Sequence, residues 1–188
     1  MKHLLSKTVL FSVALCLATG SSLEAAGLEN GTPVCTAADD QAGQGIIEDG
    51  FGNLIIIWED SRSGNKDIYA QKFDIYGNML WAADGVPVCT MTGDQEFPSI
   101  VSDGSGGAII AGQDIRSGSS RDISAQRRDA NGSRLWLLSG VSVCTATEDQ
   151  WYPRMTSDGS GGAILAWRDY RDGAFDANIY AQRIDGTG

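Results

Sequence analysis

Histidine is almost absent from this sequence. The one histidine, His3, lies in a leader that we expect to be removed, so the mature chain is predicted to contain no imidazole. Histidine is the usual general base for serine and cysteine nucleophiles and a common zinc ligand. Its absence argues against most familiar hydrolases of those kinds and against a zinc site.

No apolar run is long enough to cross a bilayer. The leader places Lys2 and Lys7 before an apolar run over residues 9–18 and then continues with small residues. This order is typical of a secretory signal peptide rather than of a membrane span. We therefore predict a signal peptide over 1–26 and a mature chain over 27–188. The expected location is the periplasm, the cell surface or the medium, without membrane insertion after cleavage.

Positive charge is scarce as well. Fourteen Lys and Arg stand against 24 Asp and Glu, giving a formal net charge of −10. Such an acidic surface repels phosphate backbones and anionic headgroups. Nucleic acid is excluded as a partner, whereas a protein or an extracellular glycan is compatible with this charge.

The mature chain has only three cysteines, and they recur at regular intervals. Cys35, Cys89 and Cys144 are 54 and 55 residues apart, and each opens the same pattern of sequence. Equivalent positions of neighbouring repeats normally lie farther apart than the roughly 7 Å between Cα atoms that a disulfide allows. We expect buried free thiols that pack as small apolar groups.

The pattern that follows each cysteine identifies a repeat protein. Three copies span approximately 36–89, 90–144 and 145–188, and residues 27–35 match the end of a copy. A long fixed period is typical of architectures in which one unit buries its apolar face against the next. The mature chain is therefore predicted to form one three-repeat domain, with 27–35 supplying a closing strand.

Each copy reads as about four short β-strands. Asp-Gly and Asn-Gly turns recur about every ten residues, and only four prolines occur. In the second copy the expected strands are Pro98–Ser102, Ala108–Gln113, Asp122–Arg128 and Arg134–Leu138, with Val141–Cys144 continuing the last.

The second strand of each copy distinguishes between possible all-β folds. It reads LIIIW, AIIAG and AILAW, a continuous apolar run that implies burial on both faces. A blade between two other blades has this property, so we predict a β-propeller-type fold with about three blades of four antiparallel strands. A β-trefoil, which uses three four-stranded repeats, is the alternative.

The third copy also resembles a known kind of repeat. The run SDGSGGAILAWRDYRDG followed by NIYAQRID is similar to the repeats of secreted bacterial β-propellers of the TolB-like kind, with a WD40-like blade pattern. In those repeats a DG turn, an apolar strand, a D-x-R pair and an IY strand recur once per blade. The resemblance implies the propeller fold and does not specify an activity.

The two ends of the repeat region complement each other. The third copy stops at Gly188 before a closing strand, and Gly31–Cys35 matches the closing strand Gly85–Cys89. Propellers have about four to eight blades. We therefore consider a homodimer that forms a six-bladed ring, and alternatively a shortened form of a longer repeat protein.

A Trp-x-Asp-x-Arg pattern follows the second strand and provides candidate binding residues. In an extended segment its side chains share one face, the Asp and Arg can form a bidentate bridge, and the Arg can lie on the Trp ring. One interpretation is a sugar- or acid-binding notch. The other is an ion pair that fixes the loop, which the repetition favours. The residues are Trp58, Asp60, Arg62, Asp114, Arg116, Trp167, Asp169 and Arg171.

Aromatic residues at the start of the third copy are further candidates. Trp151 and Tyr152 stand where the first copy has Ala42-Gly43 and the second has Glu96-Phe97. Exposed rings there can stack on a sugar or contact a protein partner.

Carboxylates are plentiful, but none is marked as catalytic by its setting. The adjacent pairs are Asp39-Asp40, Glu59-Asp60 and Glu148-Asp149. The DGSGG segments offer oxygens to calcium, yet Asp-Gly is also a standard hairpin turn, and the turn is favoured. We assign no catalytic residue, no metal ligand and no cofactor.

Together these features predict an exported, acidic, non-catalytic β-propeller-like module that binds or scaffolds a protein or glycan. The alternative is a degenerate or divergent propeller glycoside hydrolase.

Overall fold

A computed structural model describes residues 31–173 and 176–188; the predicted signal peptide, 1–26, lies outside these residues. All regular secondary structure in the described part of the chain is β-strand. None of those residues forms a helix long and apolar enough to cross a membrane. The strands are β1 (Gln41–Glu48), β2 (Leu54–Asp60), β3 (Asp67–Phe73), β4 (Val86–Cys89), β5 (Gln95–Ser102), β6 (Ala108–Asp114), β7 (Asp122–Arg128), β8 (Val141–Cys144), β9 (Gln150–Ser157), β10 (Ala163–Asp169) and β11 (Asn178–Ile184).

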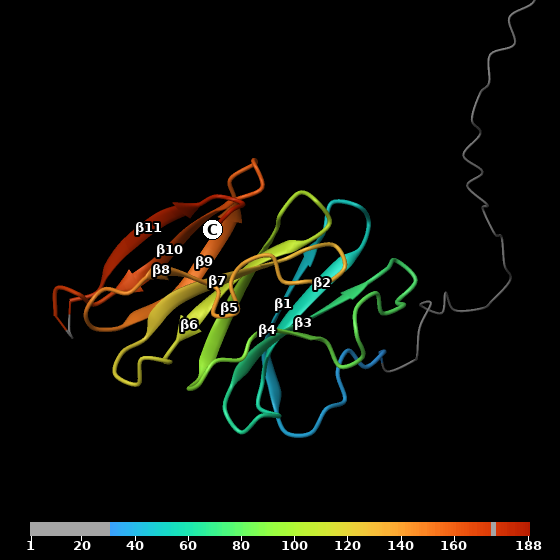
Figure 1. Cartoon of the computed structure of the whole chain (residues 1–188), viewed down its shortest axis with the longest axis horizontal. Coiled ribbons are helices and arrows are strands. Elements are labelled where there is room, and N and C mark those ends of the chain that lie inside the picture. The colour runs from blue at the N-terminus through green and yellow to red at the C-terminus, as the bar shows by residue number, and fades with distance from the viewer. Residues whose placement is uncertain (1–30, 174–175) are drawn as a thin grey trace, which may run out of the picture. The chain divides into compact units, whose positions relative to one another are not determined.

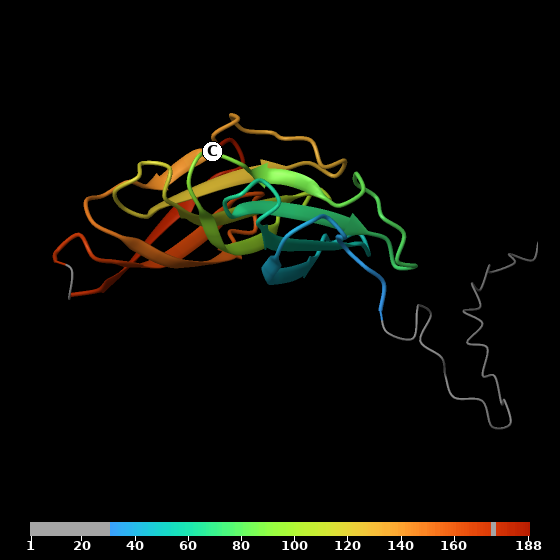
Figure 2. The same cartoon turned by 90° about the horizontal axis from the view of Figure 1, so that it is seen from below.

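The strands form three separate antiparallel sheets, each from consecutive strands. The first sheet has the order β1-β2-β3-β4, the second β5-β6-β7-β8 and the third β9-β10-β11. The second sheet lies between the other two (Figures 1 and 2), and its β5 contacts both β1 and β9. Repeated antiparallel units of this kind confirm the predicted propeller-type fold, and the trefoil alternative is wrong.

The turn between the first two strands of each sheet is built on one aspartate. Asp49 Oδ1 accepts hydrogen bonds from the backbone N–H groups of Phe51 and Asn53, at 2.7 and 3.0 Å. Asp103 and Asp158 make the equivalent bonds in the other two sheets. Side-chain acceptance of nearby N–H groups is what favours aspartate in turns. The Asp-Gly turns are thus confirmed at these positions.

The continuous apolar second strand behaves as predicted only in the middle sheet. Every residue of β6 is buried, because the second sheet has a neighbour on each face. In contrast, Leu54 on β2 is 39% exposed and Ile164 on β10 is 44% exposed. The outer faces of the first and third sheets therefore carry apolar side chains that no described residue covers.

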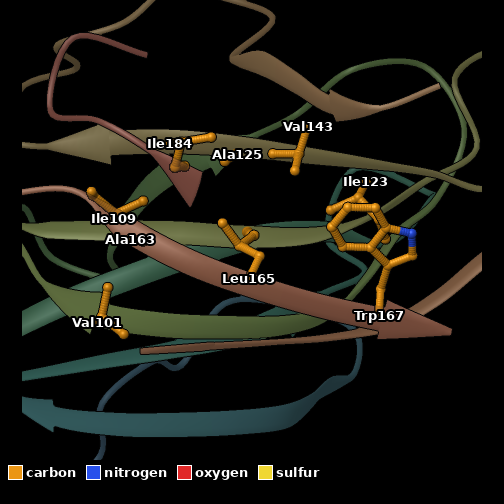
Figure 3. Packing of buried hydrophobic residues seen from close by; sticks show 10 residues of the cluster. Val101, Ile109, Ile123, Ala125, Val143, Ala163, Leu165, Trp167 and Ile184 are labelled. Carbon is orange, nitrogen blue, oxygen red and sulfur yellow. The ribbon is translucent and has the colours of Figure 1, made fainter. Parts of the chain in front are cut away.

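Two apolar cores fill the spaces between the sheets. One lies between the first and second sheets and includes Ile55, Ile57 and Ile110. The other lies between the second and third sheets, where Leu165 and Ile109 are fully buried (Figure 3). Each core joins residues of two successive repeats, so burial of the apolar faces holds the sheets together.

The expected strand Arg134–Leu138 is not formed. Only Arg134 makes a β-bridge, to Arg128, and β8 is confined to Val141–Cys144. The intervening segment is held by Gln126, whose Nε2 donates to Leu137 O at 2.7 Å. A buried glutamine amide thus replaces the ladder hydrogen bonds expected of a strand.

Candidate functional site

The first Trp-x-Asp-x-Arg copy is a compact hydrogen-bonded unit at the end of β2. Arg62 Nε donates to Asp60 Oδ1 at 2.8 Å, and Trp58 Nε1 donates to Asp60 Oδ2 at 2.8 Å. The guanidinium of Arg62 lies over the ring of Tyr69 on β3, 4.1 Å from its centroid. The expected stacking of arginine on tryptophan is therefore wrong, because the indole is engaged through its N–H instead.

The third copy repeats this unit. Trp167 Nε1 and Arg171 Nε donate to Asp169 at 2.8 and 2.9 Å, and Arg171 covers the ring of Tyr180 at 3.8 Å. Burial opposes ionisation of Asp169, but the hydrogen bonds from Arg171 and Trp167 outweigh it, and the pKa of Asp169 falls to about 2. The carboxylate is therefore a permanently charged acceptor near neutral pH.

The second copy lacks the tryptophan but keeps the ion pair. Asp114 and Arg116 are paired, and Arg116 Nη1 also donates to Ser139 O at 2.8 Å. The three copies lie on different sheets. They place each predicted Asp with its Arg and do not bring the three pairs together.

Each ion pair also contacts a cysteine from the preceding closing segment. Arg62 Nη2 lies 3.0 Å from Cys35 Sγ, and Arg116 and Arg171 contact Cys89 and Cys144 in the same way. The thiols are free and half-buried, rather than fully buried as expected. Burial raises the pKa of the Cys89 thiol to about 11. These contacts tie one repeat to the next.

A cleft of about 410 Å³ opens beside strands β1, β5 and β9, and we call it the inner cleft. This size is within the range of small-molecule sites, about 300–1,000 Å³. Its lining residues are Gly43, Gln44, Glu59, Lys66, Phe97, Pro98, Tyr152 and Arg154.

Irregular backbone shapes the wall of the inner cleft. The register of β5 shifts between Glu96 and Ser99, and Phe97 and Tyr152 adopt φ values of 51° and 56°. A non-glycine residue in this region costs on the order of 1–3 kcal/mol and is found preferentially at functional sites. The two rings meet edge to face, with centroids 4.8 Å apart, and each remains about two-fifths exposed.

Of the two aromatic candidates from the third copy, only Tyr152 lines the inner cleft. Trp151 lies instead under the guanidinium of Arg121, 4.4 Å from the ring centroid. It lines a separate depression together with Glu148, Asp149 and Tyr170.

Two carboxylates from neighbouring sheets meet on Lys66 at the inner cleft; Glu59 and Lys66 line the cleft, and Glu96 lies beside it. Lys66 Nζ lies 3.3 Å from Glu59 Oε2 and 2.7 Å from Glu96 Oε1. Glu59 Oε1 also accepts a 2.8 Å hydrogen bond from Phe97 N–H. The hydrogen bond from Lys66 to Glu96, together with that to Glu59, raises the pKa of Lys66 above its usual value. The ammonium thus offsets the repulsion that would otherwise separate two carboxylates.

Sequence reasoning missed Glu96 and Lys66, although the repeats contain a signal for this site. Glu59 stands where the other copies have Gln113 and Arg168, and Glu96 aligns with alanine and tryptophan. The polar residues of the inner cleft are thus positions where the repeats disagree. A unique cluster in a repeat protein must come from such positions, whereas the search for recurring motifs selected the Asp–Arg pairs.

Among the described residues, no group of three or more His, Cys, Asp or Glu side chains is placed to bind a metal ion. The carboxylates of the DGSGG segments are engaged by the turn amides described above.

Solved structures with a similar fold include glycoside hydrolases. An α-L-arabinofuranosidase from Fusarium graminearum, in complex with an iminosugar inhibitor, has a TM-score of 0.52 and 15% identity over 76% of this chain and 45% of its own. An endo-arabinase from Bacteroides thetaiotaomicron has a TM-score of 0.48 and 14% identity over 77% and 56%. The chain therefore spans about half the length of these proteins. At this identity the first similarity supports the all-β fold.

No known protein family and no curated protein matches the sequence, so the resemblance to TolB-like repeats has no support from a family match. The prediction that the chain is not an enzyme is contradicted by the similarity of its fold to that of the α-L-arabinofuranosidase, a glycoside hydrolase. That prediction relied on the missing histidine and on the lack of a unique acid cluster. Glycosidases need no histidine, and Glu59, which lines the inner cleft, shares the Lys66 ammonium with Glu96.

Proposed function

We propose that the inner cleft binds a glycan and hydrolyses a glycosidic bond, as in the glycoside hydrolase alternative drawn from the sequence. One observation carries the proposal: Glu59 and Glu96, which belong to neighbouring sheets, share the Lys66 ammonium. Most glycosidases use two carboxyl groups that flank the scissile bond.

The spacing of the two acids favours hydrolysis with retained configuration. Because one ammonium contacts both, Glu59 Oε2 and Glu96 Oε1 are at most about 6 Å apart. Retaining enzymes separate the two carboxyl groups by about 5–5.5 Å, whereas inverting enzymes need about 6.5–9.5 Å for a water molecule.

The surroundings of the two acids suit different roles. Glu59 is held by the Phe97 N–H and by Lys66, with a side chain only 8% exposed. A fixed, ionised carboxylate is suited to attack the anomeric carbon while the bond to the leaving oxygen breaks. Glu96 is held only by Lys66 and is the more accessible of the two acids. In this role Glu96 takes a proton from solvent when the bound sugar displaces Lys66, donates it to the leaving oxygen, and then takes one from the water that releases the sugar from Glu59.

The rings of Phe97 and Tyr152 provide apolar surface for a sugar face beside these acids. Arabinose glycosides are the first substrates to test, because the arabinofuranosidase has a similar fold. The predicted signal peptide would deliver the protein to extracellular glycans.

The test is release of nitrophenol from p-nitrophenyl α-L-arabinofuranoside by the wild type and by Glu59→Gln and Glu96→Gln. We expect each variant to lose about 10²–10⁴-fold in rate with an unchanged melting temperature. Glu48→Gln, an exposed acid at the other end of β1, serves as the matched control and should retain full activity. Absence of wild-type turnover on arabinosides and other aryl glycosides would refute the proposal.

A further inference from the structure

The outer edge of β11 is the most incomplete part of the fold. The equivalent strands β3 and β7 pair with β4 and β8, whereas no described strand pairs with the outer edge of β11. Ile179 is 73% exposed, although its counterparts Ile68 and Ile123 are 3% and 0% exposed. Among the described residues the third sheet thus has three strands where the other two sheets have four.

The segment Thr32–Cys35 is the opposite case, because it matches a closing strand but no sheet precedes it among the described residues. Cys89 follows β3 in the first sheet yet contacts Arg116 of the second sheet. Cys35 contacts Arg62 of the first sheet in the same way. Thr32–Cys35 therefore occupies, beside the first sheet, the place of a fourth strand from a preceding blade.

The outer face of the first sheet also exposes apolar side chains of the kind that another sheet would cover. Ile46 and Leu54 are 60% and 39% exposed, whereas their counterparts on the second sheet, Ile100 and Ala108, pack against the first sheet. A recess of about 450 Å³ lies on this face, lined by Val34, Cys35, Gln41, Ala42, Gln44, Gly45, Ile46, Ile56 and Trp58.

The contacts between successive sheets predict which residue enters this recess. Ile68 of the first sheet lies against Gly112 of the second, and Ile123 of the second lies in one cluster with Trp167 of the third. Trp58 is the counterpart of Gly112 and Trp167, and Ile179 is the counterpart of Ile68 and Ile123.

We propose that a second copy of this chain docks its first sheet on the third sheet, with its Thr32–Cys35 segment pairing with β11. The register follows that of β3 and β4, where Ile68 pairs with Cys89 and Ala70 with Val86. In the assembly Ile179 is opposite the partner's Cys35, and Ala181 is opposite the partner's Thr32.

Successive sheets of the chain are joined by backbone hydrogen bonds, and the proposed junction has a donor and an acceptor for the same bond. Gln95 N–H donates to Lys66 O at 2.7 Å, and Gln150 N–H donates to Arg121 O at 2.8 Å. In the proposed assembly the equivalent bond runs from the partner's Gln41 N–H to the carbonyl oxygen of Ala177. The new junction therefore repeats the polar contacts of the two existing junctions as well as their apolar contacts.

Two copies of the chain give a number of blades that is usual for a propeller. The described residues of each chain form three sheets, so two copies give a six-bladed ring, within the usual range of about four to eight blades. The same junction then occurs twice, and the open edge of each β11 is covered.

Light scattering after size-exclusion chromatography tests the assembly, with the chain mass fixed by mass spectrometry. The wild type should have twice the chain mass and Ile179→Asp the mass of one chain, because an aspartate would be buried at the junction. Leu138→Asp changes a residue that is 64% exposed, against 73% for Ile179, in a loop of the second sheet and should remain dimeric. A folded wild-type monomer, or an unchanged dimer with Ile179→Asp, would overturn the proposal.

A cross-link tests the register even if Ile179→Asp fails to fold. Directly opposed residues in antiparallel strands have Cα atoms about 4.5–5.5 Å apart, within reach of a disulfide. Thr32→Cys combined with Ala181→Cys should therefore give dimers on a non-reducing gel, beyond any formed by either single variant. Unlinked monomers, or a ladder of larger species, would contradict a closed two-copy ring. The readouts are mass and cross-linking, so they are independent of glycosidase activity.

Discussion

At the scale of single residues, the repeated Asp–Arg pairs show what a sequence can and cannot predict. The spacing of Asp60 and Arg62 was sufficient to predict their ion pair, because residues two apart on an extended segment share a face. The stacking of Arg62 on Tyr69 could not be predicted in this way. It depends on the register between β2 and β3, in which Trp58 is opposite Tyr69.

The ion pair of the third copy should contribute to acid stability. The pKa of Asp169 is about 2 in the folded chain against a usual 3.8. Its contribution is therefore complete above about pH 4 and is lost as the pH falls through 2. Asp169→Asn should lower the free energy of unfolding by about 2 kcal/mol at pH 7 and by much less at pH 2, as measured by urea unfolding. The exposed Asp176→Asn is the control, and an equal cost at both pH values would contradict this interpretation.

Backbone strain at the inner cleft can be measured separately from the loss of the ring. Phe97 has a positive φ, and the equivalent position in the first copy is Gly43. Phe97→Ala and Phe97→Gly both remove the ring, but only glycine adopts this conformation without cost. We expect Phe97→Gly to be more stable than Phe97→Ala by about 1 kcal/mol in thermal or urea unfolding. If alanine is the more stable replacement, the strain is absent.

At the scale of the elements, strand patterns predicted most of the fold but not the ends of the repeats. The apolar run of β6 gave correct burial on both faces because the second sheet has two neighbours. The segment Arg134–Leu138 has strand-forming residues, yet its backbone is held by Gln126. A local pattern cannot reveal that a distant glutamine will take up those hydrogen bonds.

The packing of β6 has a direct energetic consequence. Ile109 is fully buried in the core between the second and third sheets. Ile109→Ala should therefore cost about 2–5 kcal/mol of unfolding free energy, through lost burial and the cavity left behind. Leu137→Ala, at a site 74% exposed, should change it by less than about 0.5 kcal/mol. Similar costs for the two variants in urea unfolding would contradict the described core.

At the scale of the whole molecule, the repeat period predicted the propeller-type architecture, and the inner cleft remained hidden. Glu59 and Lys66 line the cleft and Glu96 reaches Lys66 from the second sheet, so only the packing of the sheets brings the three residues together. No contiguous segment contains all three residues, so a search for sequence motifs could not find this cluster.

The proposed assembly also predicts a property of the entire molecule. If the first sheet of one copy completes the third sheet of another, association stabilises the folded state by mass action. The melting temperature should then rise with protein concentration for the wild type and not for Ile179→Asp. A melting temperature independent of concentration over a hundredfold range would contradict this coupling.

The central claim is that Glu59 and Glu96 form a retaining glycosidase pair, and the most direct measurement is proton NMR of an arabinofuranoside during hydrolysis. The account predicts that the first sugar released has the anomeric configuration of the substrate, and that Glu59→Gln releases none under the same conditions. A first product of inverted configuration, or equal turnover by Glu59→Gln, would contradict it.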